Sequence, residues 1–489
     1  MEDWEKLAER ALTIAKDQGA SYSDIRIEEI KEENLSVKSG VVDLVEKSTD
    51  FGFGIRVIAD GAWGFAASAD LNPKSIEQTA HLAVEIAKAS ALVKSKEVVL
   101  SPLSKVTDSY ETPVVTDPFS VPLKEKIDYL LFLDGLLNKV SGISQTEAFM
   151  NFIRRNKLFA SSEGSVIHQL IVQSGAGMSA AAQGGTPSGG MRGRPEMSTR
   201  SYPNSSGQHQ TKGYELIKEL EFEKNTERIT QEAIALLSAK ECPSVNTTLV
   251  LDGSQVSLQI HESIGHPLEL DRVFGAERNF SGTSFATPDE LNRLKYGSDI
   301  VNVVNDSTAP FGLGTFGYDD EGVKANRSFL IKNGILVGYL TSRETAPLVG
   351  TKSDGCMRAA SWSNVPIIRM TNTNLLPGDK TFEQIVSEVD DGIYMQTVRT
   401  WSIDDTRENF QMGCEIGWEI KNGKLGEMIK SPSYSGKTVE FWNSCDAIAD
   451  QKSWEMWGTP NCGKGQPGQN MPVSQGCSPA RFRNIKVGN

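Results

Sequence analysis

Residues 174–212 divide the chain into two parts that differ in periodicity, and this division constrains the fold more than any other feature. The stretch is dense in Gly, Ser, Ala and Gln, as in the run from Gln183 to Gly190. Such a composition predicts a flexible loop or linker, because small polar residues bury too little apolar surface to fix a conformation. We therefore place a domain boundary near it and predict two domains, 1–210 and 211–489.

The first part reads as helices combined with an antiparallel sheet. Apolar residues recur at helical spacing in three segments: 4–15, 75–91 and 124–138. Two strand-like runs flank Asp60-Gly61, a pair that favours a type I′ hairpin because both residues must reach positive φ. The pattern predicts an α+β amino-terminal domain.

The second part begins with a helical segment, 215–239, and becomes rich in strands after about residue 300. Asn333-Gly334 and Asn422-Gly423 are two further hairpin signals. Six of the eight Trp residues lie in this part, enough for a large core. We predict a β-rich carboxy-terminal domain, so that the fold class of the whole chain is α+β.

Charge and cysteine usage narrow the class of protein. The formal charge is 50 − 63 = −13, which disfavours a nucleic-acid partner, because such binding rests on Lys and Arg. The start of the chain has no signal-peptide pattern, and no apolar run approaches the roughly 20 residues that span a bilayer. Six cysteines without a C-x-x-C pair are typical of a reducing compartment. We expect a cytoplasmic protein without membrane or nucleic-acid partners.

The segment His261-Glu262-Ser263-Ile264-Gly265-His266 carries the chemistry. Asp252 with Gln255 resembles a capping box, so a helix should begin there and run into the motif. Two imidazoles are zinc ligands, and a carboxylate beside the first can take a proton from metal-bound water. The sequence therefore predicts His261 and His266 as metal ligands and Glu262 as the catalytic base.

The spacing of the two histidines requires a distorted helix. Residues five apart lie about 140° from each other around a regular helix, so their side chains would diverge. Coordination needs a π-bulge or a helix that ends between the two histidines. Gly265 tolerates an unusual backbone, and Pro267 disfavours α geometry at His266. We predict that the metal site lies on a distorted helix.

The motif itself does not identify the third metal ligand. Glu269 and Asp271 are local candidates, and the cysteines are distant ones, with Cys462 in a Gly/Pro-rich segment. Three further histidines show no partner spacing and are interpreted as structural or exposed: His81, His168 and His209.

The sequence resembles the TldD/PmbA metallopeptidase family, specifically its zinc-bearing TldD branch, over nearly the whole chain. The matching segments are 54–57, 60–66, 261–269, 319–322, 333–340, 369–373 and 462–464. The resemblance implies zinc held by His261, His266 and a cysteine at Cys462, with Glu262 catalytic. It also implies a homodimer, or a heterodimer with a metal-free relative, that encloses a cavity and cuts short or unfolded peptides.

A second cysteine, Cys477, lies near the expected ligand. Cys462 is followed by Gly463 and two more glycines, so its backbone can approach a metal closely. Cys477 precedes Ser478-Pro479 and an alternating run that reads as a terminal strand. We predict that Cys462 completes the zinc site.

The sequence thus predicts a zinc-dependent peptidase acting on short or unfolded peptides. Two alternatives stay open: another zinc amide hydrolase such as a deformylase, and a non-catalytic regulatory subunit. The second is suggested by metal-free relatives and by a link between the resembled family and DNA gyrase. The natural peptide, endo or exo cleavage, and the residues that stabilise the oxyanion do not follow from the sequence.

Overall fold

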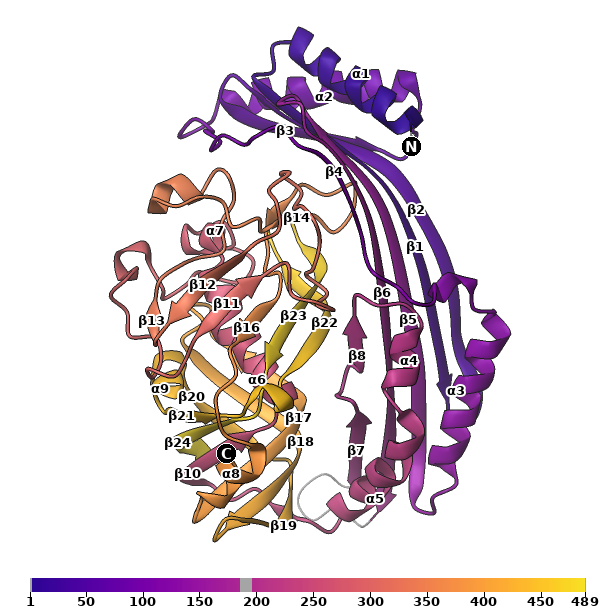
Figure 1. The fold of residues 1–489 in the computed structure, drawn as a ribbon, viewed down its shortest axis with the longest axis vertical. Coiled ribbons are helices and arrows are strands. Elements are labelled where there is room, and N and C mark those ends of the chain that lie inside the picture. The colour runs from indigo at the N-terminus through magenta and orange to yellow at the C-terminus, as the bar shows by residue number, and fades with distance from the viewer. Residues whose placement is uncertain (1, 185–195, 489) are drawn as a thin grey trace.

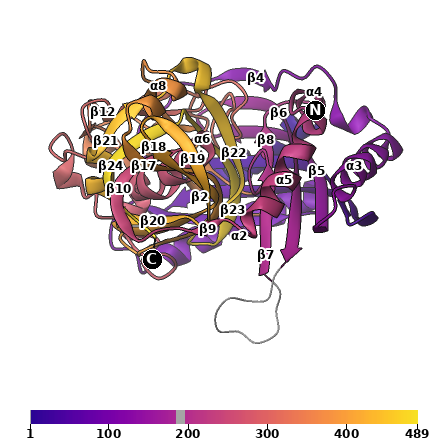
Figure 2. The same ribbon diagram turned by 90° about the horizontal axis from the view of Figure 1, so that it is seen from below.

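The chain folds into a long curved sheet with a compact carboxy-terminal part on its concave side (Figure 1). The computed structural model describes residues 2–184 and 196–488. Figure 2, seen from below, shows the two parts side by side, the amino-terminal strands along one flank of the carboxy-terminal part. The fold is α+β, as predicted.

Four long antiparallel strands form the centre of the first sheet: β1 (Tyr22–Lys38), β2 (Val41–Ala59), β5 (Ile143–Ser161) and β6 (Val166–Gly184). Shorter strands complete it: β3 (Ala62–Ser68), β4 (Thr107–Glu111), β7 (Glu196–Tyr202) and β8 (Gln208–Gln210). The order is β3-β2-β1-β5-β6-β4, and β7 and β8 also pair with β6. Asp60 and Gly61 connect β2 to β3 with φ of 50° and 74°, which confirms the predicted hairpin.

Helices cover the two ends of one face of this sheet and create two separate cores. At one end, α1 (Glu2–Asp17) and α2 (Pro73–Ala91) pack on side chains that include Ile25 and Ile27 of β1. At the other end, Leu35 and Val37 of the same strand pack against three helices: α3 (Leu123–Asn138), α4 (Glu215–Glu219) and α5 (Thr226–Leu236). Because these four β1 residues alternate along the strand, they share one face.

The prediction of a linker over 174–212 is wrong for the described residues. Residues 174–184 continue β6, and β7 and β8 follow within the same stretch; residues 185–195 lie outside the described part. The glycines serve close packing: a Cβ on Gly175 would lie 1.9 Å from the His209 ring, and one on Gly177 would lie 2.7 Å from Phe149. The predicted helix 215–239 is also interrupted, at Glu221, whose φ is 46°. The domain boundary near residue 210 stays a prediction.

The carboxy-terminal part is β-rich, as expected. Its largest sheet has the order β17 (Asp391–Ile403), β10 (Val245–Leu251), β24 (Ala480–Val487), β20 (Ser433–Lys437), β18 (Asn409–Lys421), β19 (Lys424–Lys430) and β9 (Lys240–Glu241), with β21 (Cys445–Ile448) beside β24. A second sheet contains β13 (Ile335–Leu336), β12 (Arg327–Lys332), β11 (Val303–Asp306) and β16 (Thr373–Leu375). Two pairs complete the strands: β14 (Met357–Arg358) with β15 (Ile367–Ile368), and β22 (Glu455–Lys464) with β23 (Gln469–Cys477). Short helices connect them: α6 (Gly253–Ile260), α7 (Leu270–Val273), α8 (Phe382–Ser387) and α9 (Thr438–Asn443).

Buried ion pairs join the two parts. Arg56 of β2 pairs with Asp24 at 2.8 Å and reaches Glu321 of the carboxy-terminal part at 3.4 Å. Lys157 of β5 pairs with Asp320 at 2.5 Å. The acidic residues around 320 thus pair with buried cations across the interface, where removal of one partner would leave an unpaired buried charge. None of the helices in residues 2–184 and 196–488 is long and apolar enough to span a bilayer.

Candidate metal centre

The histidine motif lies at the end of α6, which follows β10. Asp252 caps this helix, because its side chain accepts a hydrogen bond from the backbone N–H of Gln255 at 3.0 Å. The Gln255 side chain donates to Tyr434 instead of returning to the cap, so the capping box is incomplete. The helix begins where the sequence predicts.

The predicted distortion is present. Residues His261–Gly265 form a π-helical turn, and His266–Leu268 form a 3₁₀ turn. The two rings turn toward each other, with centroids 4.9 Å apart. Val256, Ile260, Ile264 and Leu268 are meanwhile fully buried in the core of the carboxy-terminal part.

The backbone angles do not support the roles that the sequence predicted for Gly265 and Pro267 in this distortion. Gly265 has φ −58° and ψ −65°, which is ordinary helical geometry. A Cβ at Gly265 would lie 2.0 Å from Sδ of Met370, so glycine is needed there for close packing. His266 is also helical, with φ −59° and ψ −45°, although Pro267 follows it.

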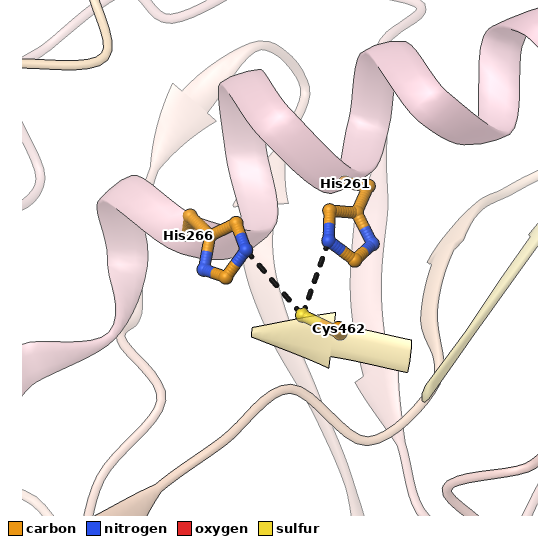
Figure 3. Close-up of side chains that lie close together, drawn as sticks. All are labelled: His261, His266 and Cys462. Atoms are coloured by element: carbon orange, nitrogen blue, oxygen red, sulfur yellow. Dashed lines mark hydrogen bonds between the residues drawn. The ribbon is translucent and has the colours of Figure 1, made fainter. Parts of the chain in front are cut away.

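Cys462 meets the two histidines from strand β22. Its Sγ lies 3.2 Å from Nε2 of His261 and 3.4 Å from Nε2 of His266 (Figure 3). The three side chains are 3–4% exposed, and their donor atoms lie within 4.8 Å of one another. The structure thus brings together the three residues that the sequence predicts as ligands.

The remaining candidate ligands lie elsewhere. Cys477 ends β23 and its thiol donates to the carbonyl of Gly253 at 3.1 Å. Asp271 accepts a hydrogen bond from Lys464 at 2.6 Å. Glu269 contacts the far side of the His266 ring, where its Oε2 lies 2.9 Å from Nδ1. Glu269 therefore orients His266 and fixes which ring nitrogen faces Cys462.

The donor set fits a zinc ion. Two imidazole nitrogens and one thiolate are common zinc ligands, at about 2.0 and 2.3 Å from the metal. Tetrahedral geometry with those bond lengths separates N from S by about 3.5 Å. The two observed distances from Sγ, 3.2 and 3.4 Å, are slightly shorter, so a small shift accommodates the ion.

Electrostatics favour an ionised thiol at this position. Burial opposes ionisation of Cys462, but His261, Arg369 and His266 outweigh burial and hold its pKa well below the usual range. Burial likewise opposes a charged His266, but Cys462 and Glu269 raise its pKa to about 9. A metal binds to the thiolate and to neutral imidazoles, so metal binding would release the proton of His266.

Glu262 and the three predicted ligands line one cavity, the metal cavity, which has a volume of about 520 Å³. Burial raises its pKa, but His261, His266 and Arg407 outweigh burial and lower the pKa overall. Arg407 Nη1 donates to Glu262 Oε2 at 2.6 Å. Glu262 is therefore a carboxylate at neutral pH, with one oxygen fixed by Arg407.

Sequence reasoning missed Arg407 and the exposed Trp401, which also lines the cavity. Both belong to the hairpin of β17 and β18, in which Arg407 has a φ of 66°. Arg407 lies 145 residues beyond Glu262 in the sequence. No local sequence pattern therefore relates it to the histidine motif. The turn residues from Asp404 onward would have predicted only the hairpin.

Family models match almost the whole chain. The PmbA/TldA metallopeptidase domain 1 matches residues 23–87, the central domain matches 116–240, and the C-terminal domain matches 244–489. The chain belongs to the TldD/PmbA metallopeptidase family. This confirms the resemblance found in the sequence.

Relatives of the chain are named as metalloproteases. A metalloprotease of Methanocaldococcus jannaschii is 29% identical over 462 residues, 93% of this chain and 94% of its own. A zinc metalloprotease TldD homolog of Saccharolobus solfataricus is 23% identical, covering 97% and 98% of the two chains. TldE from Thermococcus kodakarensis superposes with a TM-score of 0.72 at 15% identity, over 99% of this chain and 100% of that one. The likeness to TldE shows a shared fold.

Proposed function

We propose that this TldD/PmbA family member is a zinc-dependent peptidase that hydrolyses short or unfolded peptides, with Glu262 as the general base. The observation that carries the proposal is the convergence of two buried imidazoles and one buried thiolate beside a carboxylate in one cavity. His261, His266 and Cys462 would hold the ion and leave a fourth position for water or substrate, the arrangement of catalytic zinc sites.

A bound zinc ion would polarise the scissile carbonyl and lower the pKa of a water in the open position. Glu262 is placed to accept the proton from that water and to pass it to the leaving amine. Arg407 holds Oε2 of Glu262, so Oε1 is the oxygen available for the proton. Arg407 is thus a positioning residue for the base.

The proposal extends to assembly and location. We infer a dimer, either of two copies or with a metal-free relative, in the cytoplasm. A cavity that is enclosed by two subunits restricts access to flexible chains and spares folded proteins. The support for the dimer is the resemblance to the family, and the support for the location is the set of free cysteines, which is typical of a reducing compartment.

The substitution Glu262→Gln tests the proposed chemistry. The amide is nearly isosteric but cannot accept a proton at neutral pH, so the turnover of an unstructured fluorogenic peptide should fall by a factor of about 10² to 10⁴. Zinc content should stay at the level of the parent. Glu440→Gln on the exposed face of α9 is the control, and it should change neither quantity.

Two results would count against the proposal. Loss of zinc together with activity would give Glu262 a structural role. Release of formate from N-formyl peptides, without cleavage of unmodified peptides, would favour a deformylase instead.

A further inference from the structure

A second cavity adjoins the candidate metal centre and has no role in the chemistry proposed above. Its volume is about 370 Å³, within the range of about 300–1,000 Å³ typical of ligand sites. It lies between strands of the first sheet and the β22–β23 hairpin. It shares Ser206 and Asn461 with the metal cavity, and Asn461 directly precedes Cys462.

The described side chains that line this second cavity carry no formal charge at neutral pH. Phe149, Ile153 and Leu313 supply apolar surface, and Asn34 and Asn151 supply amide groups. The one titratable group is His209, whose pKa burial lowers to about 4, so the ring is neutral. By contrast, Glu262 and Arg407 line the metal cavity.

The walls of the second cavity are fixed by close packing. The His209 ring stacks on Phe149 with centroids 6.3 Å apart and planes 26° apart. Gly175 lies against His209, and Gly177 lies against Phe149, where a Cβ would collide with either ring. The two amides are held by hydrogen bonds: Asn151 donates to Asn34 at 2.9 Å, and Asn34 donates to the exposed Glu46 at 3.1 Å. The cavity is therefore preformed, and Glu46 is bonded to Asn34 of its lining without itself lining the cavity.

We propose that this cavity is a substrate subsite that accepts a large uncharged side chain of the peptide, aromatic or aliphatic. The inference rests on the proposed peptidase function and names the class of peptide that the site prefers. A charged side chain would lose its hydration in the cavity without gaining an ionic partner among the lining residues, which is unfavourable. An aromatic ring would contact Phe149 and Ile153, and its polar atoms could bond to the amides.

Binding of labelled peptides to the Glu262→Gln protein, followed by fluorescence anisotropy, tests the subsite without hydrolysis. A series of unstructured peptides would carry Phe, Lys or Glu at each position in turn. At one position, we expect Phe to bind about tenfold or more tightly than Lys or Glu.

Charge placed in the wall should reverse this preference. Asn151→Asp adds a carboxylate to the cavity, and we expect the Lys-to-Phe affinity ratio at that position to rise about tenfold. Ser206→Asp introduces the same charge at an exposed position where the two cavities meet, and the ratio should rise there as well. Asn156→Asp is the matched control, because Asn156 lies on β5 but on the opposite face of the sheet from Asn151.

The outcomes separate this inference from the proposed function. A parent without side-chain preference would overturn the subsite, as would an unchanged ratio in both Asn151→Asp and Ser206→Asp. An equal change in Asn156→Asp would overturn it too. If selective binding is found but the protein with an intact Glu262 cleaves no peptide, the subsite stands and the peptidase proposal fails.

Discussion

Replacement of Glu269 by Gln should weaken zinc binding without removing a ligand. Glu269 is fully buried, and its Oε2 lies 2.9 Å from Nδ1 of His266. A hydrogen bond to a charged group contributes about 1.5–3 kcal/mol, and 1.4 kcal/mol corresponds to a factor of ten. Because Gln still offers a neutral acceptor, we expect the lower part of that range, about a 10- to 50-fold weaker zinc affinity.

The assay is competition for zinc between the protein and a chelator of known affinity. Asp271→Asn is the matched control, since Asp271 also pairs with Lys464 but, within the described part of the chain, forms no hydrogen bond with the His266 ring. That control should leave zinc affinity within about threefold of the parent. Equal zinc affinity in Glu269→Gln and the parent, or equal losses in both variants, would refute the role of Glu269 in orienting His266.

Three further predictions follow from the site and its packing. Cys462→Ser should lower zinc content and peptide hydrolysis together, whereas Cys477→Ser should leave both near the parent, as metal analysis and a peptide assay would show; the opposite pattern would make Cys477 the ligand. Gly265→Ala should destabilise the protein by about 1–3 kcal/mol, because its Cβ would lie 2.0 Å from Met370 Sδ; a Tm equal to that of the parent would contradict the packing argument. Sedimentation should show a dimer, and a fully active monomer would contradict the proposed assembly.

The sequence predicted the site more completely than the reasons for its geometry. The side chains of His261, His266 and Cys462 lie together in the structure. Residue type and helix periodicity predicted the histidine pair, whereas Cys462 was predicted from the family resemblance and from the glycines that follow it. The role assigned to Gly265 was wrong, since its backbone is ordinary and its neighbour Met370 comes from a distant segment. Contacts between distant segments leave no periodic signal in the chain.

The same limitation explains the error at residues 174–212. Gly and Ser predict flexibility when only neighbours in sequence are considered. In the fold, Gly175 and Gly177 admit the rings of His209 and Phe149 against strand β6. The hairpin signals at residues 60–61, 333–334 and 422–423 succeeded because a two-residue turn is determined locally. Arg407 was missed because its partner Glu262 lies far away in sequence.

Metal analysis of protein purified without chelator tests the central claim most directly. We predict about one zinc ion per chain, together with peptide hydrolysis that a chelator abolishes and added zinc restores. Protein that holds no stoichiometric metal and still hydrolyses peptides in the presence of chelator would contradict the account.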